Sequence, residues 1–247
     1  MEALPYLREV SVKNHPDDLN SKYPFSIPAI NSLTNLKLGK NVTFFIGENG
    51  SGKSTLLEAL AIALGFNAEG GSVNYQFSTR DSHSNLYEYL SIVRSYLRPK
   101  DGFFLRAESF FNVATNIEEM DSVSMNAPSI IGAFGNISLH AQSHGESFWS
   151  LLMNRFFGKG LYLLDEPEAA LSPARQLSAL SRIHQLAENS SQFIIATHSP
   201  ILMAYPGALI YEFSREGIKE IEYEETDHYQ ITKSFLNNRE IMLKELF

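Results

Sequence analysis

Residues 42–64 read VTFFIGENGSGKSTLLEALAIAL, in which two apolar runs flank a glycine-rich turn. The turn, residues 47–54, fits the pattern G-x-x-x-x-G-K-[ST] at every fixed position. Residues 42–46 are β-prone and predict a buried strand, while residues 54–64 have helical composition and Gly65 is a stop signal. A strand that turns through glycines into a helix is the context that a phosphate-binding loop requires. The same flanks disfavour the alternative, a glycine-rich turn that carries Lys-Ser by chance.

The positions of this turn have distinct physical roles in binding ATP. Glycines let the backbone wrap closely around phosphate oxygens and present its N–H groups to them. We expect Lys53 to reach the β- and γ-phosphates and the Ser54 hydroxyl to coordinate Mg²⁺, while the helix N-terminus adds partial positive charge. The predicted nucleotide-binding residues of this segment are Gly47, Glu48, Asn49, Gly50, Ser51, Gly52, Lys53, Ser54 and Thr55.

A second apolar run ends in two carboxylates. Residues 161–164 predict a fully buried strand, and Asp165, Glu166 and Pro167 follow it directly. In an open parallel sheet ligands collect beyond the carboxyl ends of the strands, so we expect this pair beside the phosphate loop. Asp165 is predicted to hold Mg²⁺ through water, and Glu166 to accept a proton from the attacking water. A solvated Asp-Glu-Pro turn is the alternative, which the upstream phosphate loop disfavours.

The rest of the chain alternates strand and helix signals. Further strands are predicted at residues 7–13, 103–106 and 193–196, with a short one at 73–77 and a hairpin of 208–213 and 218–223. Helices are predicted at residues 86–97, 146–157, 173–188 and 229–247, and short helices with loops at 112–142. Buried strands that alternate with helices predict an α/β fold with a mostly parallel sheet covered on both faces. We expect one domain, residues 1–247, with a helical subregion at roughly residues 80–158.

Composition limits the class of protein. The chain has 247 residues, of which 44% are hydrophobic and 19% are charged, an ordinary globular mixture. It has no cysteine, which excludes disulfides and thiolate metal sites and fits a reducing cytosol. We find neither a signal peptide nor an apolar run long enough to span a bilayer, so we expect a cytoplasmic protein without direct membrane insertion. The net charge of −8 argues against broad nucleic-acid binding but leaves room for a local basic groove.

The order of four motifs resembles the ABC ATPase superfamily. GENGSGKST is followed by QSHGES, then by LLDEPEAALSP, then by ATHSP. Within the superfamily these motifs look like the soluble branch of recombination, repair and chromosome-segregation ATPases, and like small stand-alone bacterial ATPases. The resemblance covers nearly the whole chain. It implies a P-loop fold with an N-terminal antiparallel β region and a helical subregion beside the parallel sheet.

Residues 143–147, SHGES, stand where the family has its signature, usually Leu-Ser-Gly-Gly-Gln. Ser143 and Gly145 match that signature, whereas Glu146 replaces its glutamine. The resemblance implies that Ser143, Gly145 and Glu146 cap the γ-phosphate of an ATP held by a second copy. It therefore implies a head-to-tail homodimer around two ATP molecules. An ordinary polar helix cap is the alternative.

Two further segments match family motifs, and one expected motif is not clear. Residues 169–173 match the D-loop that crosses the dimer interface, and His198 matches the switch histidine that contacts the γ-phosphate and the attacking water. Lys53, Glu166 and His198 are thus the predicted catalytic residues. Family members also carry a glutamine after a strand between the phosphate loop and the signature. In its place this chain offers Glu108, a candidate Mg²⁺ ligand, or Ser109, with Gln76 as an earlier alternative. Tyr23 or Phe25 is the candidate for stacking on adenine, although either could be a core residue.

Three functions are compatible with these motifs. The leading one is an ATP-hydrolysing switch, whose dimer closes on ATP and passes its motion to an effector protein or to nucleic acid. The second is the nucleotide-binding subunit of an ABC transporter, which the atypical signature and the unclear glutamine disfavour. The third is an ATP-locked scaffold with little turnover.

Overall fold

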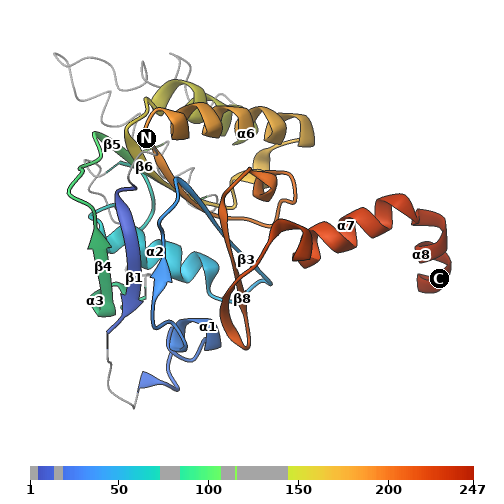
Figure 1. Ribbon diagram of the computed structural model, residues 1–247, viewed down its shortest axis with the longest axis horizontal. Coiled ribbons are helices and arrows are strands. Elements are labelled where there is room, and N and C mark those ends of the chain that lie inside the picture. Colours follow the sequence, from blue (N-terminus) through green and yellow to red (C-terminus); the bar gives the residue numbers. More distant parts are fainter. Residues whose placement is uncertain (1–4, 14–18, 73–83, 107–114, 116–143) are drawn as a thin grey trace.

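The computed structural model describes residues 5–13, 19–72, 84–106, 115 and 144–247 (Figure 1). These residues form a six-stranded sheet in the order β5-β6-β7-β3-β8-β9 and a three-stranded sheet in the order β2-β1-β4. The predicted α/β class with a mostly parallel sheet and an antiparallel region is confirmed. The predicted segments 73–77 and 112–142 lie outside the described residues, and the division into one domain with a helical subregion stays a prediction.

The six-stranded sheet carries the buried strands that the apolar runs predicted. Its strands are β3 (Val42–Gly47), β5 (Asp101–Arg106), β6 (Gly160–Asp165), β7 (Gln192–Ala196), β8 (Leu209–Ser214) and β9 (Gly217–Glu220). All neighbours are parallel except β9, which forms the predicted hairpin with β8. Every residue of β3, β6 and β7 is buried, which is why these strands are continuous apolar runs in the sequence.

Helices cover both faces of this sheet and divide the core into two layers. Helix α2 (Lys53–Ala63) lies on one face, and α6 (Pro173–Glu188) lies on the other together with α5 (His144–Ser150) and the π-helical turn η5 (Leu151–Arg155). Because side chains alternate along a strand, Phe44 packs into the α6 layer and Phe45 into the α2 layer. The predicted helices at residues 54–64 and 173–188 are confirmed, and the one at 146–157 is π-helical in its second half.

The three-stranded sheet corrects one prediction. It consists of β1 (Leu7–Val12), β2 (Leu36–Lys37) and β4 (Leu90–Arg94). The short helix α3 (Leu86–Tyr89) leads directly into β4 and contacts α2, whereas the short helix α1 (Pro28–Asn31) contacts β8 and β9. A single helix was predicted at residues 86–97, but the helix ends at Tyr89 and the chain continues as β4. Strand β4 pairs antiparallel with β1, with Val10 opposite Ile92. The β-branched residues Ile92 and Val93 favour a strand. The apolar spacing of this segment suits a helix as well as a strand, and pairing with β1 selects the strand.

The C-terminal segment leaves the body of the molecule. One helix was predicted at residues 229–247, but there are two, α7 (Asp227–Asn237) and α8 (Arg239–Leu246), because Asn238 has φ −128° and ψ 32° and interrupts the helical backbone. Figure 1 shows both helices extending away from the sheets, and neither has a buried residue. We call residues 227–247 the C-terminal arm. The remaining short turns are η6 (Pro167–Ala170), η7 (Leu202–Ala204) and η8 (Tyr223–Glu225).

Candidate functional site

The loops after β3, β6 and β7 meet at one edge of the six-stranded sheet. Strand β7 lies between β3 and β6, and all three run in the same direction. Their carboxyl ends therefore bring together the glycine-rich turn after β3, the acidic pair at the end of β6 and His198 after β7. This is the arrangement that the sequence predicted, because parallel strands present all of their carboxyl ends at one edge.

The glycine-rich turn needs glycine for two separate reasons. Gly47 has φ +133°, and a Cβ atom there would lie 2.2 Å from the carbonyl oxygen of Phe213 in the adjacent strand β8. Gly52 has φ +103° and is the N-cap of α2. Both backbone conformations disfavour any residue with a side chain. The turn is thus a tight passage from strand to helix, with N–H groups at the start of α2 left for a ligand.

Lys53 curls over this turn and is almost fully buried, with 4% of its surface exposed. Its Nζ atom donates hydrogen bonds of 2.8 Å to the carbonyl oxygens of Gly47 and Glu48. Desolvation lowers the pKa of Lys53, and the negative charges of Glu166 and Asp165 oppose that shift. A cationic group held inside the loop, facing two carboxylates, is positioned to meet a phosphate.

Ser54 and Asp165 join the turn to the acidic pair. The Ser54 hydroxyl donates a hydrogen bond of 2.8 Å to Oδ1 of Asp165, and Asp165 is only 7% exposed. A hydroxyl and a carboxylate oxygen form the hard donor set that Mg²⁺ prefers. Nearby, the Ser51 hydroxyl oxygen is buried without a hydrogen-bond partner in the described part of the chain. The donor set and this orphaned hydroxyl fit a magnesium–phosphate group.

Glu166 and His198 face each other beyond the strand ends. Glu166 has a left-handed backbone, with φ 48° and ψ 52°, and its N–H donates to the carbonyl oxygen of Ala196 at 2.9 Å. Its Oε1 lies 3.6 Å from Nε2 of His198, and this nitrogen has no hydrogen-bond partner among the described residues. Burial and the charge of Lys53 lower the pKa of His198, while Glu166 opposes the shift. A neutral ring nitrogen therefore faces a carboxylate across a short gap.

Glu168 contacts His198, and the sequence analysis assigned Glu168 no role. Its Oε1 accepts a hydrogen bond of 2.6 Å from the backbone N–H of His198, so the η6 turn is tied to the loop after β7. Desolvation raises the pKa of Glu168, and its Oε2 is buried without a hydrogen-bond partner in the described segments. The only available sequence signal was its position two residues after Glu166, which by itself does not predict such a contact.

His228 is a second contact that the sequence analysis missed. It lies in the first turn of α7, and its Nε2 is 3.2 Å from Nδ1 of His198. Burial lowers the pKa of His228, and the charges of His198 and Lys53 lower it further. The C-terminal arm is thus in direct contact with the predicted catalytic histidine. No motif or spacing rule relates two residues that lie 30 positions apart in different elements.

The signature segment lies against the turn that follows the acidic pair. A Cβ atom on Gly145 would be 2.3 Å from the carbonyl oxygen of Ala170, so the start of α5 packs closely on η6. Glu146 is exposed. The other predicted members, Ser143 of the signature and the candidate metal ligand Glu108, lie outside the described residues.

The structure separates the two candidates for adenine stacking. Phe25 is 1% exposed and packs edge-on against Tyr89, so it is a core residue. Tyr23 is 63% exposed, and its hydroxyl lies 3.3 Å from Oγ1 of Thr55 at the start of α2. Tyr23 therefore stays a candidate, because it presents an aromatic ring to solvent beside the phosphate loop.

Comparison with known sequences gives a family match over most of the chain. Residues 26–242 match the protein-family model described as AAA domain. ABC transporter G family member STR2 of Medicago truncatula is 28% identical over 172 residues, which cover 64% of this chain and 24% of that protein. ABC transporter G family member 22 of Arabidopsis thaliana is 28% identical over 177 residues, 64% of this chain and 23% of that protein. The chain thus spans about a quarter of the length of these relatives.

Solved structures with the same fold include an ABC transporter and an SMC head. An ABC transporter described as metal-chelate type, in an inward-facing conformation, gives a TM-score of 0.51 at 18% identity and covers 93% of this chain and 88% of that one. An SMC head bound to the C-winged helix domain of ScpA gives a TM-score of 0.51 at 14% identity, and the match covers 88% of this chain and 98% of that one. At these identities the likeness concerns the fold alone. In the described part of this chain, no helix combines the length and the apolar character needed to cross a membrane.

Proposed function

This chain belongs to the AAA domain family and has the fold of ABC ATPases, and from that premise we propose that it binds ATP with Mg²⁺ and hydrolyses the β–γ bond in a head-to-tail homodimer. We further propose that it is a single ATPase domain that acts in the cytoplasm. Family membership supports an ATPase in general terms. The particular mechanism is supported by the residues at the edge of the sheet.

The observation that carries this proposal is the hydrogen bond of 2.8 Å between Ser54 and Asp165. It brings together the end of the phosphate loop and the end of β6, which are 111 residues apart in the chain. Parallel strand ends place the two motifs at one edge of the sheet, and this hydrogen bond puts their side chains in direct contact. Together they form a site with a buried cation, Lys53, on one side and oxygen ligands for a divalent metal on the other.

In the proposed mechanism the protein positions groups and stabilises charge. Bound Mg²⁺, held by Ser54 and Asp165, would neutralise charge on the β- and γ-phosphates. Lys53 exchanges its two backbone carbonyl partners for phosphate oxygens. Glu166 accepts a proton from the attacking water, and the unpartnered Nε2 of His198 orients that water and the γ-phosphate.

Two residues act on this reaction through His198. Glu168 fixes the backbone N–H of His198, and His228 contacts the Nδ1 atom of its ring. A hydrogen bond at one ring nitrogen sets which nitrogen carries the proton, and so determines whether Nε2 donates or accepts. We assign Glu168 and His228 as positioning residues, because neither is proposed to touch ATP.

The dimer is supported by the signature segment. Gly145 is buried and packs against Ala170 of the η6 turn, so the start of α5 and the D-loop of one copy are in contact. In a head-to-tail dimer the signature residues Ser143, Gly145 and Glu146 would cap the ATP of the second copy. Closing on ATP and opening after hydrolysis would then move a partner, either an effector protein or nucleic acid.

The transporter alternative is less favoured, even though the curated relatives are ABC transporters by name. The match to those relatives covers 64% of this chain, whereas the AAA domain match covers residues 26–242. The ATP-locked scaffold differs from the leading proposal in turnover, so a rate measurement separates the two.

The test is Mg²⁺-dependent phosphate release from ATP, measured together with molecular mass, for the native chain and for Glu166→Gln. We expect turnover by the native chain, and an ATP-bound dimer that barely turns over for the variant. Lys53→Ala is the matched control, because it should lose ATP binding and therefore dimerisation. A native chain that binds ATP and dimerises without releasing phosphate would support the scaffold, and one that stays monomeric with ATP would refute the paired site.

A further inference from the structure

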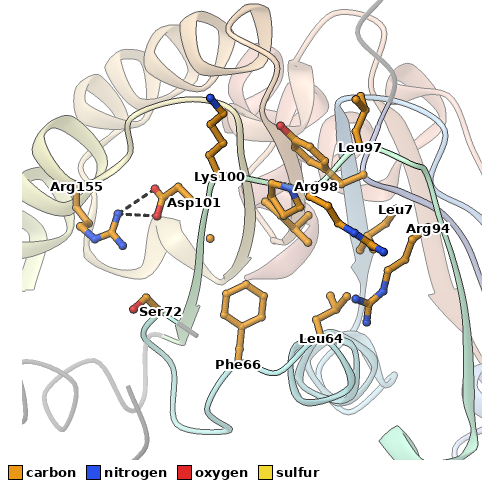
Figure 2. A pocket seen from close by; sticks show the side chains of 14 residues that line it. Leu7, Leu64, Phe66, Ser72, Arg94, Leu97, Arg98, Lys100, Asp101 and Arg155 are labelled. Carbon is orange, nitrogen blue, oxygen red and sulfur yellow. Dashed lines mark hydrogen bonds and ion pairs between the residues drawn. The ribbon is translucent and has the colours of Figure 1, made fainter. Parts of the chain in front are cut away.

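A pocket lies at the opposite edge of the six-stranded sheet from the phosphate loop. It has a volume of about 280 Å³ and is formed where α2 ends and where β5 and β6 begin (Figure 2). Its walls come from the residues after α2, from the connection between β4 and β5, and from Arg155 at the end of η5. We call it the arginine pocket. It shares no lining residue with the ATP site proposed above.

The one carboxylate that lines this pocket already has partners. Asp101 accepts hydrogen bonds of 2.8 and 2.9 Å from Nη1 of Arg155, and a third of 2.9 Å from the hydroxyl of Tyr162. The dashed lines in Figure 2 mark the contacts with Arg155. The charges of Asp101 and Arg155 therefore offset each other, and Asp101 does not neutralise the other cations of the pocket.

Arg94 and Arg98 are the remaining arginines, and they point toward the same space. Figure 2 shows their guanidinium groups converging beside Leu7, whereas the Lys100 side chain points away. Arg94 donates a hydrogen bond of 3.3 Å to the carbonyl oxygen of Ala63, and no ion pair involves Arg94 or Arg98 within the residues that the structure describes. Two like charges directed into one space repel each other. An anion between them would convert that repulsion into attraction.

Arginine pairs have a characteristic ligand. The planar guanidinium group presents parallel N–H donors that match the oxygens of a phosphate, and it binds them as a fork. The local charge is also unusual for this chain, whose net charge is −8. A phosphate is therefore a better match for Arg94 and Arg98 than a neutral ligand or a cation.

Apolar side chains line the pocket beside the arginines. The Phe66 ring faces the pocket in Figure 2, with Leu64 beside it and Leu97 on the connection between β4 and β5. Phe66 is 6% exposed, so its position is fixed by packing. A volume near 280 Å³ is at the small end for ligand sites, which suits one nucleotide-sized unit rather than a larger cofactor.

We propose that the arginine pocket binds a phosphate-bearing ligand of the nucleotide class, with its phosphate on Arg94 and Arg98 and its apolar part in the space lined by Leu64, Phe66 and Leu97. The ligand can be a free nucleotide or the phosphorylated end of a strand, because both present the same chemistry. Helix α2 connects the two sites. Lys53 is its first residue, and Ala63, its last residue, accepts a hydrogen bond from Arg94 through its carbonyl oxygen. A ligand that takes the Arg94 guanidinium competes with that carbonyl group.

The test measures binding at the arginine pocket in a chain whose phosphate loop is disabled. Lys53→Ala serves as the parent, so the result does not depend on the proposed ATPase activity. AMP, inorganic pyrophosphate and a 5′-phosphorylated dinucleotide are titrated calorimetrically into this parent and into the parent with Arg94→Gln and Arg98→Gln. A matched control removes the same charge on the β8–β9 hairpin, with Arg215→Gln and Lys219→Gln.

We expect saturable binding of AMP or of the dinucleotide to the parent, weakened at least about tenfold by the Arg94 and Arg98 changes and unaffected by the hairpin control. Tighter binding of the dinucleotide identifies a strand end as the source, and tighter binding of AMP a free nucleotide. Absence of saturable binding would overturn the proposal, as would equal weakening by the control pair. If the double variant unfolds, Arg98→Gln alone repeats the comparison, because Arg98 makes no hydrogen bond or ion pair with any other residue that the structure describes.

Discussion

The Nδ1 atom of His198 and the Nε2 atom of His228 lie 3.2 Å apart, and this contact links the loop after β7 to the first turn of the C-terminal arm. A hydrogen bond between two imidazole nitrogens requires that one of them has no proton. The contact therefore forms only while at least one of the two rings is neutral. It gives a residue outside every recognised motif a direct influence on the predicted catalytic histidine.

Replacing His228 should slow hydrolysis without weakening ATP binding. We expect His228→Ala to lower kcat about tenfold and to leave KM for ATP unchanged, because the variant removes the partner of Nδ1 and touches no predicted ATP-binding residue. His228→Gln places an amide near the former Nε2 position and should recover most of the rate. Steady-state kinetics on the three chains checks this. A parallel rise in KM, or no rescue by glutamine, would refute the positioning role.

The same histidines make stability depend on pH in a defined direction. Burial lowers the pKa of both His198 and His228 from 6.5, so the unfolded chain binds more protons than the folded chain in mildly acidic solution. Their contribution to stability is complete above pH 6.5 and is lost as the pH falls below it. We expect the melting temperature of the native chain to fall more steeply than that of His228→Gln between pH about 7.5 and about 5.5. Equal slopes for the two chains would show that His228 does not contribute.

Two substitutions of Glu168 test whether its hydrogen bond to His198 or its negative charge is the important property. Glu168→Gln keeps an oxygen that can accept the N–H of His198, whereas Glu168→Ala leaves this N–H without its acceptor. We expect the alanine variant to lose about 1–3 kcal/mol of unfolding free energy and most of its hydrolysis rate, and the glutamine variant to keep the larger part of both. Urea unfolding and phosphate release measure the two effects. If both variants lost activity equally, the carboxylate charge would be the important property.

The phosphate loop can be tested for backbone strain with two glycines. Gly47→Ala would place a Cβ atom 2.2 Å from the carbonyl oxygen of Phe213 at φ +133°, so we expect a loss of more than about 3 kcal/mol or failure to fold. Gly39→Ala is the control, since a Cβ atom there has no neighbour within 4 Å and the φ is not positive. Urea midpoints of the two variants give the comparison. Equal midpoints would mean that the loop tolerates the side chain by shifting.

The sequence predicted those parts of the fold that local signals determine. The strand at Val42–Gly47, the glycine-rich turn and the helix from Lys53 all follow from residues within one short stretch. Parallel topology then predicted that Asp165 and His198 would lie at the same edge. Each step needed only residue type, spacing and the rule that parallel strands share a carboxyl edge.

The remaining features depend on contacts that no local pattern encodes. Leu90–Arg94 has apolar spacing that suits a helix as well as a strand, and pairing with β1 decides the outcome. Glu168 and His228 reach His198 only because separate elements converge in the fold. Such contacts join positions 30 residues apart and leave no trace in spacing or composition.

The C-terminal arm, which has no buried residue, should behave as a separate unit in amide hydrogen exchange. Helix α8 has eight residues, fewer than an isolated helix needs to be stable in water. Helix α7 is attached at its start, where the Thr226 hydroxyl caps it and His228 meets His198. Its backbone amides should thus be protected in the first turns and exchange faster toward Asn238, while those of β3, β6 and β7 exchange only when the whole molecule opens. The gradient of protection along the arm would then report how firmly His198 holds it.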